Sequence, residues 1–245
     1  MGTRKKQETQ KMAFSNTEVV FNNLFSLFTY LAVLVGVIVF ALMAFLIIKY
    51  RERKNSQDPE DTPRLGRIPI VRGHGRNVLI TVSLSTIILL ALIIGSFAAV
   101  DTLLTPPNGT WCYGLYPGYG AQSPLNQDCP RIDVTGHQFY WEFSYPHALP
   151  HAPLYTEKYV FRVPKDATVV IDVTSADVFH DFGIIPFKIK TDAIPGRVNT
   201  IWFQPYQNGT YLIQCFELCG SGHYYMNATL IVMQVPQFQA WYNST

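Results

Sequence analysis

The stretch 215–226, CFELCGSGHYYM, brings two cysteines, a histidine and a methionine together on one short loop. Thiolate, imidazole and thioether are soft to intermediate donors, and a weak Met ligand beside Cys and His is typical of copper electron-transfer sites. A loop for a single copper of this type supplies only one Cys. Two thiolates can instead bridge two copper ions and let one unpaired electron spread over both. The stretch therefore predicts a dinuclear copper site, which needs one imidazole for each metal.

The second imidazole must come from elsewhere, because the stretch holds only His223. His180, in ADVFHDF, lies 35 residues before Cys215 and is the best candidate. Together with KTDAIPGR at 190–197, the segments SADVFHDFGI and CFELCGSGHYYM closely resemble subunit II of haem-copper respiratory oxidases. This cytochrome c oxidase subunit carries the dinuclear copper A centre.

The resemblance implies a complete ligand set. Two imidazoles, two bridging thiolates, one weak axial thioether and one axial backbone carbonyl would hold the two coppers. The carbonyl belongs to a glutamate whose side chain would reach a magnesium ion at the interface with the catalytic subunit, since magnesium prefers hard oxygen ligands. The imidazoles would be those of His180 and His223, and the bridging thiolates those of Cys215 and Cys219. Met226 would supply the thioether, and Glu217 the backbone carbonyl.

Two other kinds of site use similar residues. Structural zinc clusters usually arrange their ligands as two spaced pairs and do not use Met. A redox-active or copper-delivery thiol pair, as in an oxidase assembly factor, needs only Cys215 and Cys219. The further presence of His180, His223 and Met226 favours the copper relay site over both.

Two long uncharged segments precede this region. There are 30 uncharged residues between Glu18 and Lys49, and 24 between Arg76 and Asp101. Each exceeds the roughly 20 residues that span a bilayer, and the first is too long for a cleavable signal peptide. Residues 1–100 are therefore predicted to form an N-terminal tail and a transmembrane hairpin, with helices at about 22–48 and 78–100 and a connecting loop at 49–77.

The charges predict the orientation of the hairpin. The connecting loop carries eight Lys and Arg between Lys49 and Arg76, against four in the first eleven residues. By the positive-inside rule the loop is cytoplasmic and both termini face outside. We expect the plasma membrane of a prokaryote, with a multi-pass chain and its copper domain on the outer face.

Residues 101–245 have the pattern of a soluble all-β domain. Short segments rich in β-branched and aromatic residues alternate with Pro, Gly, Asn or Asp turns, as in RIDVTGH, TVVIDVT and ATLIVMQV. Even spacing of this kind predicts a β-sandwich or Greek-key barrel, with PQFQAWYN adding a short helix at the end. The resemblance makes it a cupredoxin. The predicted whole is a membrane-anchored all-β protein: a two-helix transmembrane hairpin followed by an extracytoplasmic cupredoxin Greek-key β-barrel.

The aromatic run at 138–145, QFYWEFSY, resembles the family's strand beside the copper centre, with one departure. Where the family usually has Trp, Tyr and Trp, this chain has Phe139, Tyr140 and Trp141, the predicted electron relay. Phe139 lacks the indole N–H and is a poorer relay from cytochrome c. Seven Lys and Arg stand against eleven Asp and Glu in residues 101–245, and Asp177 and Asp181 flank His180. Such a surface would steer a basic partner. The Phe nevertheless favours a donor other than a standard soluble cytochrome c, either a small blue-copper protein or a membrane-bound cytochrome.

The resemblance implies the function of an electron-accepting subunit of a terminal respiratory oxidase. Copper would pass electrons to haem in catalytic subunit I, where oxygen is reduced to water and protons are translocated. Lys190, Asp192 and Arg197 would help to dock the domain there. Many relatives have a Glu at the start of the second helix, whereas this chain has no acidic residue near Asn77. We therefore expect proton entry to differ or to come from the partner subunit. The alternatives are the copper subunit of a related nitric oxide reductase and a membrane-anchored copper-delivery protein.

Two cysteines and several short motifs remain. Cys112 and Cys129 lie in a Gly- and Pro-rich segment in an oxidising compartment, so a disulfide between them is a hypothesis and a pair of free thiols is the alternative. Four glycosylation sequons fall in the same domain. Together with the missing Trp, they favour a prokaryotic and archaeal source. They begin at Asn108, Asn208, Asn227 and Asn243.

Overall fold

The structure is a computed structural model that describes residues 13–51, 75–104, 131–145 and 155–244. The chain divides into two compact units, residues 24–98 and the remainder. The hypothesis of a Cys112–Cys129 bridge, the sequon at Asn108 and most of the predicted loop at 49–77 lie outside the described residues.

The described part of residues 24–98 consists of two long apolar helices, which extend beyond this unit at the start of the first helix and at the end of the second. They are α2, Asn16–Lys49, and α3, Gly75–Leu104, and both are long and apolar enough to cross a membrane. Each extends beyond the range expected from hydropathy at both ends. Helix α2 begins early because its polar first turn is capped: Ser15 Oγ accepts a hydrogen bond from the Glu18 N–H at 3.2 Å.

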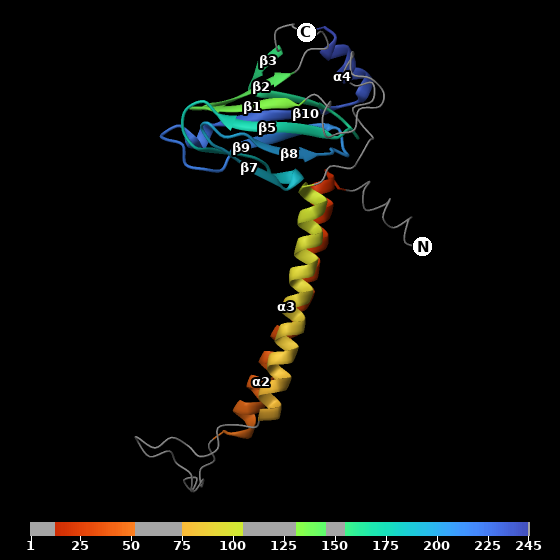
Figure 1. The fold of residues 1–245 in the computed structure, drawn as a ribbon, viewed down its shortest axis with the longest axis vertical. Helices are drawn as coiled ribbons and strands as arrows, with labels where there is room; N and C mark the ends of the chain where they lie inside the picture. The colour runs from red at the N-terminus through yellow and green to blue at the C-terminus, as the bar shows by residue number, and fades with distance from the viewer. Residues whose placement is uncertain (1–12, 52–74, 105–130, 146–154, 245) are drawn as a thin grey trace. The chain divides into compact units, whose positions relative to one another are not determined.

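The second unit is built mainly from two five-stranded sheets (Figure 1). One sheet has the order β3-β2-β1-β5-β8 and the other the order β4-β10-β9-β6-β7. Strands distant in sequence pair in parallel, β1 with β5 and β4 with β10, so the sheets are not built from consecutive hairpins alone. The strands are β1 Ile132–His137, β2 Tyr140–Tyr145, β3 Tyr155–Lys158, β4 Val160–Pro164, β5 Val169–Ser175, β6 His180–Ile184, β7 Ile189–Ala193, β8 Asn199–Phe203, β9 Gly209–Cys215 and β10 Asn227–Met233.

The core lies between the sheets and is rich in aromatic rings. Alternate residues of β5 and β10 are buried, as expected for strands with one face on a core. The rings of Phe143 and Phe161 stack at 4.8 Å. A short helix, α4 Val235–Tyr242, adds Phe238 and Tyr242 to this core, as the sequence predicted. Two 3-10 turns, η1 Ile185–Phe187 and η2 His223–Tyr225, complete the described elements.

Strand β6 was not predicted, although it carries the first candidate ligand. All five of its residues are buried, so it has no alternation of buried and exposed positions. Its sequence, HDFGI, is poor in strand-forming residues. Gly183 is needed there because an added Cβ would lie 2.6 Å from the ring of Phe216, which covers the outer side of the strand.

The segment just before α2 packs against the β-sandwich. Ser15 Oγ donates to the Phe187 carbonyl at 2.9 Å, and Thr17 Oγ1 donates to the same oxygen. The Asn16 N–H donates to the Gln204 carbonyl at 3.2 Å, and Asn16 Oδ1 accepts from the Gln204 N–H at 2.7 Å. Ser15 and Thr17 are both buried. The start of α2 is therefore part of the same unit as the sandwich.

Replacing both hydroxyls, in a Ser15→Ala/Thr17→Val variant, should destabilise the β-sandwich by about 2–3 kcal/mol, because it removes the cap and both donors to a buried carbonyl. Thermal unfolding of the full chain in detergent, followed by tryptophan fluorescence, measures the change. Ser85→Ala is the matched control, since Ser85 Oγ donates only within α3, to Val82 O. Equal melting temperatures for the two variants would contradict the prediction.

Candidate metal centre

The loop predicted from CFELCGSGHYYM connects two neighbouring strands. Cys215 is the last residue of β9, Met226 immediately precedes β10, and the two strands pair antiparallel. The Cys215 N–H donates to the Met226 carbonyl at 3.2 Å and closes the loop. Cys219 and His223 lie within it, and His223 begins η2. The four candidate ligands of the loop therefore lie at one end of the sandwich.

His180 joins them through the sheet. It begins β6, which pairs antiparallel with β9, and Phe182 lies opposite Cys215. This register brings His180 Nδ1 to 3.8 Å from Cys215 Sγ. The pairing of strands thus supplies the imidazole that the loop lacks.

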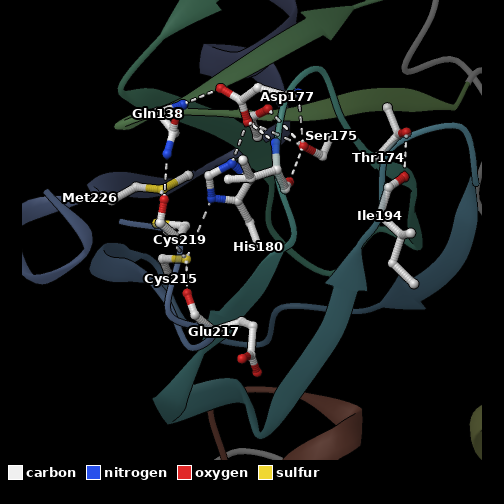
Figure 2. Close-up of polar contacts among 12 residues, drawn as sticks. Gln138, Thr174, Ser175, Asp177, His180, Ile194, Cys215, Glu217, Cys219 and Met226 are labelled. Carbon is white, nitrogen blue, oxygen red and sulfur yellow. Dashed lines mark hydrogen bonds and ion pairs between the residues drawn. The ribbon is translucent and has the colours of Figure 1, made fainter. Parts of the chain in front are cut away.

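The donor atoms lie in two similar groups, one beside each sulfur; Figure 2 shows the group at Cys215, with His180 and Glu217. Cys215 Sγ and Cys219 Sγ are 3.9 Å apart. His180 Nδ1 lies beside the first sulfur, and His223 Nδ1 lies 3.7 Å from the second. Met226 Sδ is 3.7 Å from Cys219 Sγ, and the Glu217 carbonyl oxygen is 3.3 Å from Cys215 Sγ. Each sulfur therefore has one imidazole and one weaker donor of its own.

This donor set fits soft metal ions. A metal–thiolate bond of about 2.3 Å allows one ion to touch both sulfurs at once, because their separation is less than twice that length. The ligand atoms of His180, Cys215 and Cys219 lie within 4.8 Å of one another, and all three residues are buried. His180 and Met226 have no exposed surface. Apart from the half-buried His223, the candidate ligand side chains are therefore shielded from water and rich in sulfur, as in copper electron-transfer sites.

Comparison with known proteins agrees with this geometry. A family model described as the periplasmic domain of cytochrome c oxidase subunit II matches residues 150–235. The heme-copper oxidase subunit 2 of Aeropyrum pernix is 34% identical over 235 residues, which cover 93% of this chain and 91% of the relative. This chain belongs to the subunit II family of haem-copper oxidases.

Other relatives match with lower coverage. The cytochrome c oxidase subunit 2 of Alkalihalophilus pseudofirmus is 29% identical over 209 residues, 85% of this chain and 53% of the relative. The crystal structure of the periplasmic domain of subunit II from Bradyrhizobium japonicum is 30% identical in sequence, with a TM-score of 0.44, and covers 49% of this chain and 95% of that one. The predicted family and the predicted fold, a two-helix anchor followed by a cupredoxin-like β domain, are confirmed. This subunit II is a membrane-anchored respiratory protein with a ligand group suited to copper.

The two thiols of this subunit II differ in acidity. Burial opposes ionisation of Cys215, but the hydrogen bond with His180 and nearby backbone donors outweigh it and lower its pKa to about 6. Burial, followed by the negative charge of Cys215, raises the pKa of Cys219 to about 11. Without metal, one thiolate next to one thiol is therefore the expected state near neutral pH.

The carboxylate of Asp177 fixes the ring of His180. Asp177 Oδ1 lies 2.8 Å from His180 Nε2, and it also accepts from the Val178 N–H at 2.6 Å. A carboxylate on the far nitrogen orients the ring and leaves Nδ1 free to bind a metal. Burial opposes a charge on this imidazole, but its hydrogen bonds to Cys215 and Asp177 outweigh burial and raise the pKa of His180.

Asp181 does not contribute to a charged surface, contrary to the expectation from sequence. Its side chain is 2% exposed and pairs with Lys190 Nζ at 2.5 Å across β6 and β7. Burial raises the pKa of this carboxyl, and Lys190 offsets part of that effect. Asp192 lies directly opposite Asp181 in the register, and Arg197 is exposed beyond β7. The acidic surface beside His180 is therefore smaller than the sequence suggests.

The three predicted relay residues, one in the turn before β2 and two at the start of β2, do not all face the site. Trp141 is buried, and its ring makes an edge contact with His180 at 5.9 Å. Phe139 packs on the metal-binding loop, where an added Cβ on Gly222 would lie 2.3 Å from its ring. Tyr140 instead stacks on His137 at 4.6 Å, under Lys158. Phe139 and Trp141 border the site, whereas Tyr140 belongs to a separate aromatic cluster.

Gln138 was not singled out from the sequence. Its backbone N–H donates to Asp177 Oδ2 and its side-chain Nε2 donates to the Cys219 carbonyl, both at 2.6 Å. A glutamine inside an aromatic run has no periodicity or ligand chemistry that would mark it. Only the turn between β1 and β2, folded over the loop, reveals the contact.

Thiolate ultraviolet absorbance of the metal-free chain, with Cys112 and Cys129 replaced by Ser so that only Cys215 and Cys219 titrate, should rise in two separate steps. Because the pKa of Cys215 is lowered, about one thiolate per chain should appear as the pH rises through about 6, and the second only as it approaches about 11. Cys215→Ser should abolish the first step, and Cys219→Ser should keep it. A single step of two thiolates near the ordinary cysteine pKa would contradict the assignment.

Proposed function

We propose that this chain is the electron-accepting subunit of a terminal respiratory oxidase and that its metal is a dinuclear copper A centre. The observation that carries the proposal is the pair of buried cysteine sulfurs, 3.9 Å apart, each with its own imidazole. A mononuclear site or a structural zinc cluster needs no such duplicated arrangement. By the family's pattern the ligands are His180, Cys215, the carbonyl of Glu217, Cys219, His223 and Met226.

Copper, when bound, supplies a one-electron couple shared between two metal ions. The chain's own part is to hold the donors in place. His180 is fixed by Asp177 on one side and by β6 on the other, and Cys215 is fixed by the ladders of β9. Trp141, beside the His180 ring, and Met226, beside the Cys219 sulfur, are fully buried and help to keep water away from these ligands. A preorganised and dry site needs little rearrangement when an electron arrives or leaves.

The partner for electron release is proposed to be the haem of catalytic subunit I. Oxygen reduction to water and coupled proton translocation would take place there. Glu217 supports this arrangement, since its carbonyl faces Cys215 while its carboxylate points away from the sulfurs (Figure 2). That carboxylate is available to a magnesium ion at the interface. Lys190, Asp192 and Arg197 would dock the same side of the domain. The copper domain would lie on the outer face of a prokaryotic plasma membrane.

Metal analysis of the full chain tests the proposal. We expect two coppers per chain and an EPR hyperfine pattern from one electron shared equally by two nuclei. Cys219→Ser removes one bridging thiolate and should leave at most one copper, with the spectrum of a single nucleus. Tight zinc binding in preference to copper would overturn the dinuclear assignment. Failure to co-purify with a haem subunit would favour the copper-delivery alternative. A haem partner that reduces nitric oxide but not oxygen would favour the reductase alternative.

The proposed electron donor is a protein other than a standard soluble cytochrome c, and its electrons would enter near Phe139 and Trp141. Asp181 is buried against Lys190, and Asp177 is engaged by His180 and Gln138, so few free carboxylates remain near the loop. Stopped-flow reduction by a lysine-rich cytochrome c should therefore be slow and should change by less than about threefold with salt. Steered encounters gain roughly ten- to thousandfold from electrostatics. Fast reduction at low salt that is abolished at high salt would contradict this.

A further inference from the structure

The turn between β1 and β2 lies over the metal-binding loop and links it to a second segment of the site. Gln138 is the residue that makes the link, and the following argument rests on the proposed copper function. Its backbone N–H donates to Asp177 Oδ2 at 2.6 Å. Its side-chain Nε2 donates to the Cys219 carbonyl, also at 2.6 Å. One exposed residue therefore holds both the carboxylate behind His180 and the backbone of Cys219 (Figure 2).

Strand pairing positions the His180 side of this link, but it does not reach the Cys219 side. His180 stands at the start of β6, and Cys215 at the end of β9, so strand ladders place both. Cys219 lies in the middle of the loop, beyond the last ladder pair of β9. Within the loop, the His223 N–H donates to the Gly220 carbonyl at 3.1 Å, and this hydrogen bond orders the second half of the loop. The Cys219 carbonyl is held from outside the loop by Gln138.

The metal-binding loop packs closely against the turn between β1 and β2. A Cβ added to Gly220 would lie 2.9 Å from Gln138 Nε2 and 3.2 Å from the ring of Phe139. The φ of Gly220 is +129°, a conformation that residues with a side chain rarely adopt. Glycine is therefore required there by both space and backbone, and it lets the Cys219 carbonyl reach the amide. This close fit is what a specific tether requires.

We propose that Gln138 is a positioning residue for the copper centre, fixing the Cys219 half of the site in register with the His180 half. Through Asp177, the hydrogen bonds run continuously from the His180 ring to the Cys219 backbone. Equal sharing of an electron needs two metal ions in matched surroundings, and the tether keeps the second thiolate matched to the first. The role needs a side chain of this length with an N–H donor: Met has the length without the donor, and Glu replaces the N–H with an acceptor.

The first test uses the metal-free full chain. In Gln138→Met, backbone amides of residues 216–224 should exchange with deuterium roughly fivefold faster than in the parent, as expected for the loss of one hydrogen bond. Gln204→Leu is the matched control, because Gln204 Nε2 donates to the Asp166 carbonyl at 2.8 Å far along the chain from the loop. It should leave exchange in the loop unchanged. Unchanged exchange in Gln138→Met would overturn the proposal.

The second test uses the copper-loaded chain. Gln138→Met and Gln138→Glu should still bind copper, but with unequal hyperfine coupling to the two nuclei, whereas Gln204→Leu keeps the parent spectrum. A residue with only a general structural role would lower the melting temperature without changing this pattern. Parent-like spectra in both Gln138 variants would overturn the positioning role and leave the proposed function intact. A parent chain that never binds two coppers would overturn the proposed function, while amide exchange still decides whether the tether exists.

Discussion

The antiparallel pairing of β6 with β9 is the constraint on which the site depends. It sets Phe182 opposite Cys215 and so brings an imidazole to a thiolate that lies 35 residues later in the chain. A slip of one residue in this register would turn His180 to the other face of the sheet. Such a slip would also turn Asp181 to the face that Phe182 and Ile184 present to the core. Core packing and site geometry therefore select the same register.

Around this pairing, hydrogen bonds to fixed groups take the place of water. The buried imidazole of His180 has a partner on each ring nitrogen, Asp177 on one and Cys215 on the other. The buried carboxylate of Asp181 is stabilised by Lys190 on the neighbouring strand. Burying an unpaired charge would cost several kcal/mol, so each of these partners is needed for the polar groups to remain in the interior. The same partners fix the orientation of the His180 ring, which is the preorganisation that the proposed electron relay requires.

The sequence could point to the candidate ligands because their chemistry is local or sharply marked. Two Cys, a His and a Met in twelve residues have few other uses, and His180 was found by its motif. The sequence predicted the surroundings less well. Strand β6 has no alternation, since both its faces are covered, and Asp181 was assigned to the surface because its partner is set by strand pairing. Gln138 was missed because its contacts join segments that only the folded chain brings together.

The anchoring segment shows how the fold also constrains the membrane arrangement. Ser15 and Thr17 donate to the carbonyl of Phe187, at the end of β6 opposite to His180, so the first turn of α2 is bound to the β domain. Helix α2 therefore starts on the side of the membrane where that domain lies. The charge pattern predicted this arrangement from electrostatics. The hydrogen bonds at Phe187 lead to it independently, because a helix whose first turn is tied to the domain cannot begin on the far side.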